Sequence, residues 1–255
     1  MENFWVFECI QIVFVYCFTF FLGLLVTNYN IKVNYTRKIF SLSLLFLTMF
    51  LVNVFPFESS PYTTAINGII LVLCFISMVK PIRNRFSFLT TTFSAVNRPE
   101  DEPYTLLWLP TELIIMSSIL FIMQAYLSNY EQSVLFYIII LISGIGDGLA
   151  EPIGISFGKH KYKVKSLVLG REYVRSVEGS LCVFVTGTVV VIYFQDYMTP
   201  DQFVWALFII PITMTLTEAF SPHTWDGPFL YLMGSVATII ILEASPNSVY
   251  MIQRY

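Results

Sequence analysis

The sequence predicts an all-α fold, a polytopic bundle of transmembrane helices. The chain is 56% hydrophobic with a mean hydropathy of +0.71, and only 12% of its 255 residues are charged. Soluble domains carry roughly 25% charged residues, so this composition indicates a helical membrane protein. We expect a single integral membrane domain over residues 1–255, because the spans leave no room for a separate soluble domain.

Apolar segments that could cross a bilayer follow one another along the whole chain. A span needs about 20 apolar residues, and several of these segments are shorter, so helix ends in the loops would have to complete them. The sequence predicts about eight spans, approximately Phe4–Thr27, Ile39–Phe55, Thr63–Val79, Leu106–Tyr126, Val134–Ile145, Leu181–Phe194, Phe203–Thr217 and Phe229–Leu242.

The cations lie in alternate loops between these segments. Every Lys and Arg except Arg254 falls in the first, third or fifth loop: Lys32, Arg37, Lys38, Lys80, Arg83, Arg85, Arg98, Lys159, Lys161, Lys163, Lys165, Arg171 and Arg175. The positive-inside rule then places the N-terminus outside and these loops in the cytoplasm. Because the cations occupy short loops rather than one face, no nucleic-acid partner is expected, and the oligomeric state stays open.

Residues 144–180 form a polar stretch in this apolar chain and begin with Gly146-Asp147-Gly148, which we read as a turn at the end of the fifth span. Asp147 and Glu151 are one helical turn apart, so they would share a face if the turn is helical. Two such carboxylates can hold Mg²⁺, or one can act as a base toward a hydroxyl. The alternative is that Asp147 caps a helix and Glu151 faces solvent.

Glycines and cations follow the two acids. Gly154 and Gly158 would bracket a turn before Lys159-His160-Lys161 and would allow the backbone to approach a phosphate that the lysines neutralise. The alternative for the lysines is a basic loop that only sets topology, and His160 is then a surface residue.

A second anion site is predicted where the sixth span begins. Arg175 and Ser176 precede an apolar helix whose free N–H groups can bind phosphate, and Glu178 lies in its first turn. Simple helix capping by Ser176 and Glu178 is the alternative.

Two further acids fall on the same predicted side. Glu218 ends the seventh span and Asp226 precedes the eighth, so residues 218–227 would form a second loop that meets the Asp147 group. Capping of the eighth helix is the alternative for Asp226. Glu112, inside the fourth span, is also a candidate functional acid.

The first and third loops carry weaker signals. Arg37 and Lys38 begin the second span and are either snorkelling anchors or phosphate contacts. The acidic segment from Arg98 to Tyr104, which contains two prolines, is either a structured lid or a plain connector.

These motifs resemble those of the dolichol kinase-like family of membrane lipid kinases, which includes phytol kinases and CTP-dependent diacylglycerol kinases and is related to phosphatidate cytidylyltransferases. The resemblance depends on residues 146–150, residues 154–159 and the Arg-Ser-x-Glu-Gly-Ser segment at 175–180. Weaker support comes from Arg37-Lys38 and from Glu218-Ala219 followed by Asp226.

The resemblance implies transfer of the terminal phosphoryl group of CTP, or of another nucleoside triphosphate, to the hydroxyl of a polyprenol, phytol or diacylglycerol. Mg²⁺ would be held by some of Asp147, Glu178, Glu218 and Asp226, and Lys159, Lys161 and Arg175 would neutralise charge. Asp147 would orient or deprotonate the hydroxyl. The protein would lie in a bacterial inner membrane or an endoplasmic-reticulum-type membrane, with its site on the cytoplasmic face.

Two other functions remain open at this stage. The same site could serve a cytidylyltransferase that makes a CDP-lipid. A transporter is the third reading, but its acids would line a path across the bilayer, whereas these acids and cations gather at one predicted face.

Overall fold

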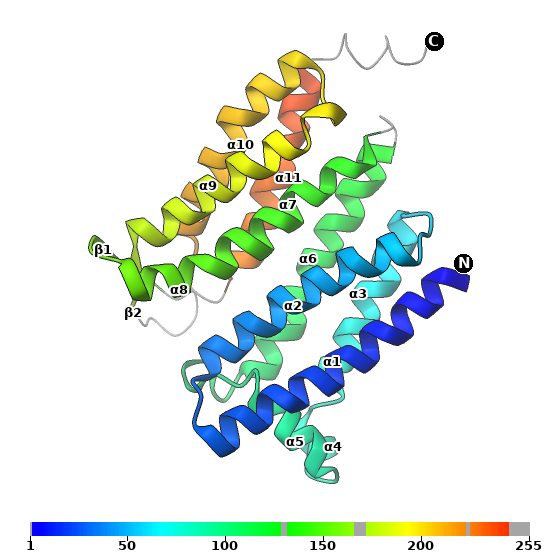
Figure 1. Ribbon diagram of the computed structural model, residues 1–255, viewed down its shortest axis with the longest axis vertical. Coiled ribbons are helices and arrows are strands. Elements are labelled where there is room, and N and C mark those ends of the chain that lie inside the picture. Colours follow the sequence, from blue (N-terminus) through cyan, green and yellow to red (C-terminus); the bar gives the residue numbers. More distant parts are fainter. Residues whose placement is uncertain (1, 129–131, 166–171, 223–224, 245–255) are drawn as a thin grey trace. The chain divides into compact units, whose positions relative to one another are not determined.

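The computed structural model describes residues 2–128, 132–165, 172–222 and 225–244, and it consists almost entirely of helices (Figure 1). The predicted all-α class is confirmed, since β1 and β2 are the only strands in the described ranges. The contacts within the chain divide it into two compact units, Met1–Ser118 and Ile119–Tyr255, where the sequence led us to expect one domain.

The first unit is formed by four membrane-type helices and two short ones. Its elements are α1 (Glu2–Tyr29), α2 (Val33–Val54), α3 (Pro61–Ile76), α4 (Lys80–Arg83), α5 (Ser87–Ser94), the 3₁₀ turn η1 (Pro99–Asp101) and the first part of α6 (Thr105–Leu127).

Helix α1 is the centre of the first unit and packs against α2, α3 and α5. Its buried residues recur every three or four positions, which is the spacing of one helix face. Phe4 and Phe7 pack with Leu51 near its start, and Val15 and Leu22 belong to a second apolar cluster further along. The unit therefore has an apolar core along most of the length of α1.

The second unit contains the remaining elements. They are the end of α6, η3 (Ser133–Leu135), α7 (Phe136–Leu141), η4 (Ile142–Asp147), α8 (Gly148–Phe157), β1 (Lys161–Lys165), β2 (Glu172–Ser176), α9 (Val177–Tyr193), η5 (Gln195–Tyr197), α10 (Pro200–Phe220) and α11 (Asp226–Ala244).

Helix α9 is the central element of the second unit. It packs against α10 on one side and against η4 and α8 on another, and α10 in turn packs against α11 (Figure 1). Val183 and Val191 of α9 are completely buried, as are Met214 of α10 and Leu230 of α11. This packing brings the end of α10 and the starts of α9 and α11 to the same end of the unit, where the polar residues lie.

Six of the described helical segments are long and apolar enough to cross a membrane: α1, α2, α6, the continuous segment Phe136–Phe157, α10 and α11. Helices α3 and α9 are apolar but shorter, with 16 and 17 residues, so the prediction of about eight spans is not confirmed. Phe50, Phe208 and other large apolar side chains on these helices are exposed, as expected where a helix faces lipid.

Candidate active site

Asp147 lies inside a helix rather than in a turn. The predicted fifth span does not end at Ile145, because the helix passes through the π-helical segment η4 and continues as α8 to Phe157. Asp147 has helical backbone angles and makes no side-chain capping hydrogen bond, so its predicted alternative role as a cap is not seen. Glu151 follows one turn later in α8. Single π-helical turns within α-helices often mark functional sites.

The rest of the polar stretch is a β-hairpin followed by α9. Strands β1 and β2 pair antiparallel, with Tyr162 opposite Arg175 and Lys161 opposite Ser176. The expected loop over 144–180 is therefore mostly ordered structure. Residues 166–171 of that loop, and residues 223–224 of the loop at 218–227, lie outside the described residues.

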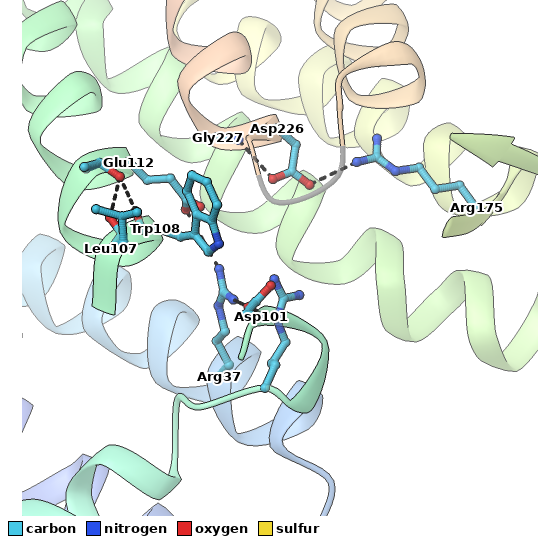
Figure 2. Close-up of polar contacts among 10 residues, drawn as sticks. Arg37, Asp101, Leu107, Trp108, Glu112, Arg175, Asp226 and Gly227 are labelled. Carbon is cyan, nitrogen blue, oxygen red and sulfur yellow. Dashed lines mark hydrogen bonds and ion pairs between the residues drawn. The ribbon is translucent and has the colours of Figure 1, made fainter. Parts of the chain in front are cut away.

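Arg175 of β2 joins two acids that are distant in sequence. Its Nη2 donates to Oδ2 of Asp226 at 3.1 Å (Figure 2), and its Nη1 lies 3.2 Å from Oε1 of Glu218. The Arg175 and Glu218 side chains are only 10% and 6% exposed. Asp226 also accepts a hydrogen bond from the Gly227 N–H. This arrangement brings the end of α10, the start of α11 and the hairpin together at one point.

Asp147 belongs electrostatically to the same group. Burial lowers the pKa of the Arg175 guanidinium, but the negative charges of Asp226, Glu218 and Asp147 raise it, and the net result is a pKa above the usual range. Arg175 is therefore a permanent buried cation among three acids, contributed by η4, α10 and α11.

Tyr162 and Ser180 extend this network. From the sequence we assigned no role to Tyr162 and included Ser180 only as the last residue of the motif at 175–180. Ser180 Oγ donates to Glu218 Oε2 at 2.7 Å and lies 2.7 Å from the Tyr162 hydroxyl. Burial raises the pKa of Tyr162, and the nearby Glu218 charge adds to this effect. Because the Ser180 proton is given to Glu218, Tyr162 must donate to Ser180. The alternation of lysines with Tyr162 in β1 was the available signal for a strand with one inward face.

In comparisons with known proteins, no family model, no curated protein and no solved structure matches the chain.

The lysines of the hairpin lie on the face away from Arg175. Successive residues of a strand point to opposite faces, so Lys161 faces away from the Tyr162–Arg175 pair, and it is exposed together with Lys163 and Lys165. Lys159, just before the strand, is also exposed. The sequence led us to expect Arg175 and Lys161 at the same phosphate. In the structure the two side chains lie on opposite faces of the hairpin.

Glu178 and Ser176 both make local contacts at the start of α9. Ser176 Oγ accepts from the Gly179 N–H at 3.1 Å, which is the capping role given as the alternative. Glu178 Oε1 lies 2.8 Å from His160 Nδ1, and both its oxygens accept from the His160 backbone N–H. Glu178 therefore holds the segment before β1 against α9, and its described hydrogen bonds do not include Arg175.

Helix packing accounts for the glycines that we assigned to phosphate binding. A Cβ on Gly154 would lie 2.8 Å from Ser176 Oγ, and one on Gly158 would lie 2.1 Å from the Gly154 carbonyl oxygen. Gly146 lies against Val183 of α9, and Gly148 is buried. These positions let α8 approach the start of α9 closely.

We expect Gly158→Ala to lower the free energy of unfolding by about 1–3 kcal/mol, because the added methyl group meets backbone that cannot move aside. Chemical unfolding in detergent micelles would measure the loss. Gly146→Ala is the matched control, since its nearest contact would be at 3.3 Å, and its effect should be smaller. Equal losses for the two variants would contradict the packing role of Gly158.

The acids predicted to bind metal do not form a protein cage. Among the described residues, no group of three or more His, Cys, Asp or Glu side chains is placed to hold a metal ion. Glu218 and Asp226 instead contact Arg175. Carboxylates fit Mg²⁺ chemically, and this ion is usually held by one or two of them together with substrate phosphates, so the donor set suits a metal that arrives with a nucleotide.

Arg37 and Lys38, the other cations that we considered as phosphate contacts, belong to the first unit. Arg37 Nη1 donates to Oδ2 of Asp101 at 2.9 Å (Figure 2), and its Nη2 lies 3.9 Å from Glu112 of α6. Arg98 Nε donates to the same Asp101 oxygen at 2.8 Å. Lys38 is partly buried in the next position of α2.

The segment from Arg98 to Tyr104 is therefore structured rather than a plain connector. Arg98 and Asp101 are 5% and 3% exposed, and they are the N-cap and the last residue of η1. We expect Asp101→Asn to lower the free energy of unfolding by about 1.5–3 kcal/mol, because two guanidinium groups lose a charged acceptor. Chemical unfolding in micelles would measure this loss of stability. Glu58→Gln, in a different loop of the same unit, is the control and should unfold like the wild type. A wild-type unfolding curve for Asp101→Asn would contradict the structural role of this acid.

Proposed function

We propose that this chain is a membrane lipid kinase, which transfers the terminal phosphoryl group of CTP or another nucleoside triphosphate to the hydroxyl of a membrane alcohol. The observation that carries the proposal is the group formed by Asp147, Arg175, Glu218 and Asp226, four polar residues from distant segments at one end of an apolar helical unit. The likeness of the motifs around them to those of the dolichol kinase-like family supports the same reaction.

Arg175 has the properties that phosphoryl transfer needs in a cation. It keeps its charge in a largely buried position, and two carboxylates fix its orientation. Such a preorganised cation can stabilise charge that develops on the transferring phosphoryl group without costly reorganisation. On the binding of a triphosphate, the phosphate oxygens would compete with Asp226, the more exposed of the two partners at 23%.

Asp147 is the acid we assign to the lipid hydroxyl. The hydroxyl oxygen attacks the terminal phosphorus, the bond from that phosphorus to the bridging oxygen breaks, and the nucleoside diphosphate leaves. The hydroxyl proton passes to the Asp147 carboxylate, which acts as the general base. The apolar faces of the surrounding helices would hold the tail of the lipid.

Mg²⁺, when it binds with the nucleotide, would supply additional positive charge at the phosphates. Glu218 and Asp226, which lie beside Arg175, would hold the ion together with Asp147 and Glu151. The positive-inside rule, applied to the basic loops, supports a cytoplasmic location for this end of the unit, where nucleotides are present.

The test uses purified protein in micelles with CTP labelled in either the alpha or the gamma phosphate and a panel of polyprenol, phytol and diacylglycerol acceptors. We expect label from the gamma position in the lipid. Label from the alpha position would show formation of a CDP-lipid and overturn the kinase. The absence of both, with folded protein and Mg²⁺ present, would overturn the assignment to nucleotide chemistry.

A further inference from the structure

A carboxyl group lies buried between the helices of the first unit. Glu8 of α1 is 1% exposed, and so is its neighbour on the same helix face, Gln11. Asn67 of α3 donates through Nδ2 to Glu8 Oε1 at 3.0 Å and to Gln11 Oε1 at 2.5 Å. Gln11 Nε2 donates to Thr48 Oγ1 of α2 at 2.9 Å. Three helices therefore supply one connected polar group.

The second oxygen of Glu8 has no partner. Oε2 is buried and receives no hydrogen bond, and the Nδ2 group of Asn67 is already shared by two oxygens. No cation forms an ion pair with Glu8 among the described residues. An unpaired negative oxygen in such a place would be very costly.

The surroundings do not supply a compensating charge. The titratable side chains of α3 are Tyr62, which is exposed, and Cys74, a buried thiol. The cations of α2, Arg37 and Lys38, lie at least about 15 Å along the helix from Thr48, and Arg37 is paired with Asp101. Helix α5, the third partner of α1, carries no charged residue. Among the described residues, no cation of α2, α3 or α5 therefore compensates a charge on Glu8.

Apolar clusters lie on both sides of this group along α1. Phe4, Phe7 and Leu51 form one cluster, and Val15 and Leu22 belong to the other. Both clusters exclude water from the carboxyl group, and an intramembrane acid of this kind is expected to have a specific role.

We propose that Glu8 carries a proton on Oε2 and that, together with Gln11, Thr48 and Asn67, it forms a proton-binding site in the interior of the first unit. The proton makes the acid neutral, so Oε1 remains an acceptor for Asn67 and no buried charge is left. Loss of the proton places a negative charge between α1, α2 and α3, and the packing of these three helices responds to it. This inference does not depend on the proposed kinase.

The first test compares the thermal unfolding of the wild type and of Glu8→Gln in micelles at about pH 4 and about pH 9. At the lower pH Glu8 is protonated in the unfolded chain as well, so we expect the two midpoints to agree, because the amide resembles the neutral acid in shape and charge. At the higher pH the wild-type midpoint should lie several degrees below that of the variant, because only the wild type must keep a proton or bury a charge on folding. Glu2→Gln, at the exposed start of the same helix, is the control and should keep the wild-type pH response.

A second measurement is spectroscopic. Infrared spectra of wild-type protein with ¹³C-labelled glutamate should show the C=O stretch of a protonated glutamate at neutral pH, and this band should be missing from the spectrum of Glu8→Gln. The same spectra are recorded with sodium replaced by choline.

Three results would overturn the proposal. One is the absence of a protonated glutamate band. Another is a band that disappears when sodium is added at constant pH, which would indicate a cation site instead. The third is a Glu8→Gln protein that is equally destabilised at both pH values, which would mean that the charged carboxylate is needed.

Discussion

Replacement of Arg175 by methionine should lower the free energy of unfolding by about 3–5 kcal/mol, the largest stability effect we expect for a single residue. Methionine keeps much of the length of the side chain but removes its charge. Glu218, which is 6% exposed, would then lose its cation while Asp226 and Asp147 remain close to it. Unfolding by a denaturant in detergent micelles would measure the change.

Two comparisons separate this effect from a general loss of a surface cation. Lys163→Met removes a cation from the outer face of the same hairpin, where it pairs with Glu172 in full contact with solvent, and it should change stability little. The double variant Arg175→Met/Glu218→Gln should recover part of the loss, because the amide leaves no unpaired charge. Equal free energies of unfolding for Arg175→Met and Lys163→Met would show that the network around Arg175 does not stabilise the fold.

Composition was sufficient to predict the helical membrane class, but the helix through Asp147 was missed. Gly146 and Gly148 are residues that usually interrupt helices, and we read Gly146-Asp147-Gly148 as a turn. In the structure, packing against α9 outweighs their low helix propensity, and Gly146 is small enough to lie against Val183. Local sequence cannot report this, because the compensating contact comes from a helix more than 30 residues away.

The candidate site was predictable in its members but not in its pairings. Arg175, Glu218 and Asp226 stood out as charges beside apolar segments, yet nothing in the sequence links residues 51 positions apart as an ion pair. The contact of Arg37 with Asp101 spans 64 positions and was equally hidden. Tyr162 was missed, and the contact of Ser180 with Glu218 was not foreseen, because neither residue is unusual until the hairpin is folded onto α9.

These pairings also change which residue should matter for catalysis. Glu178 is bonded to His160, and Glu218 and Asp226 are bonded to Arg175, so each of them has a visible structural role. Asp147 acts on Arg175 through its charge and lies at the end of a π-helical segment. Of the proposed catalytic acids it is the one that we assign to the proton of the lipid hydroxyl, so its replacement should affect the reaction most directly.

We expect Asp147→Asn to reduce the rate of lipid phosphorylation about 10²–10⁴-fold, because the amide has the size of the acid but cannot accept a proton from the lipid hydroxyl. Transfer of label from gamma-labelled CTP at saturating substrate would measure the rate. Thermal unfolding should stay close to that of the wild type, since Arg175 keeps Glu218 and Asp226. Glu172→Gln, an exposed acid on the hairpin, is the control and should retain activity. Full activity in Asp147→Asn would remove this residue from the reaction, and an equal loss in both variants would point to the hairpin rather than to a base.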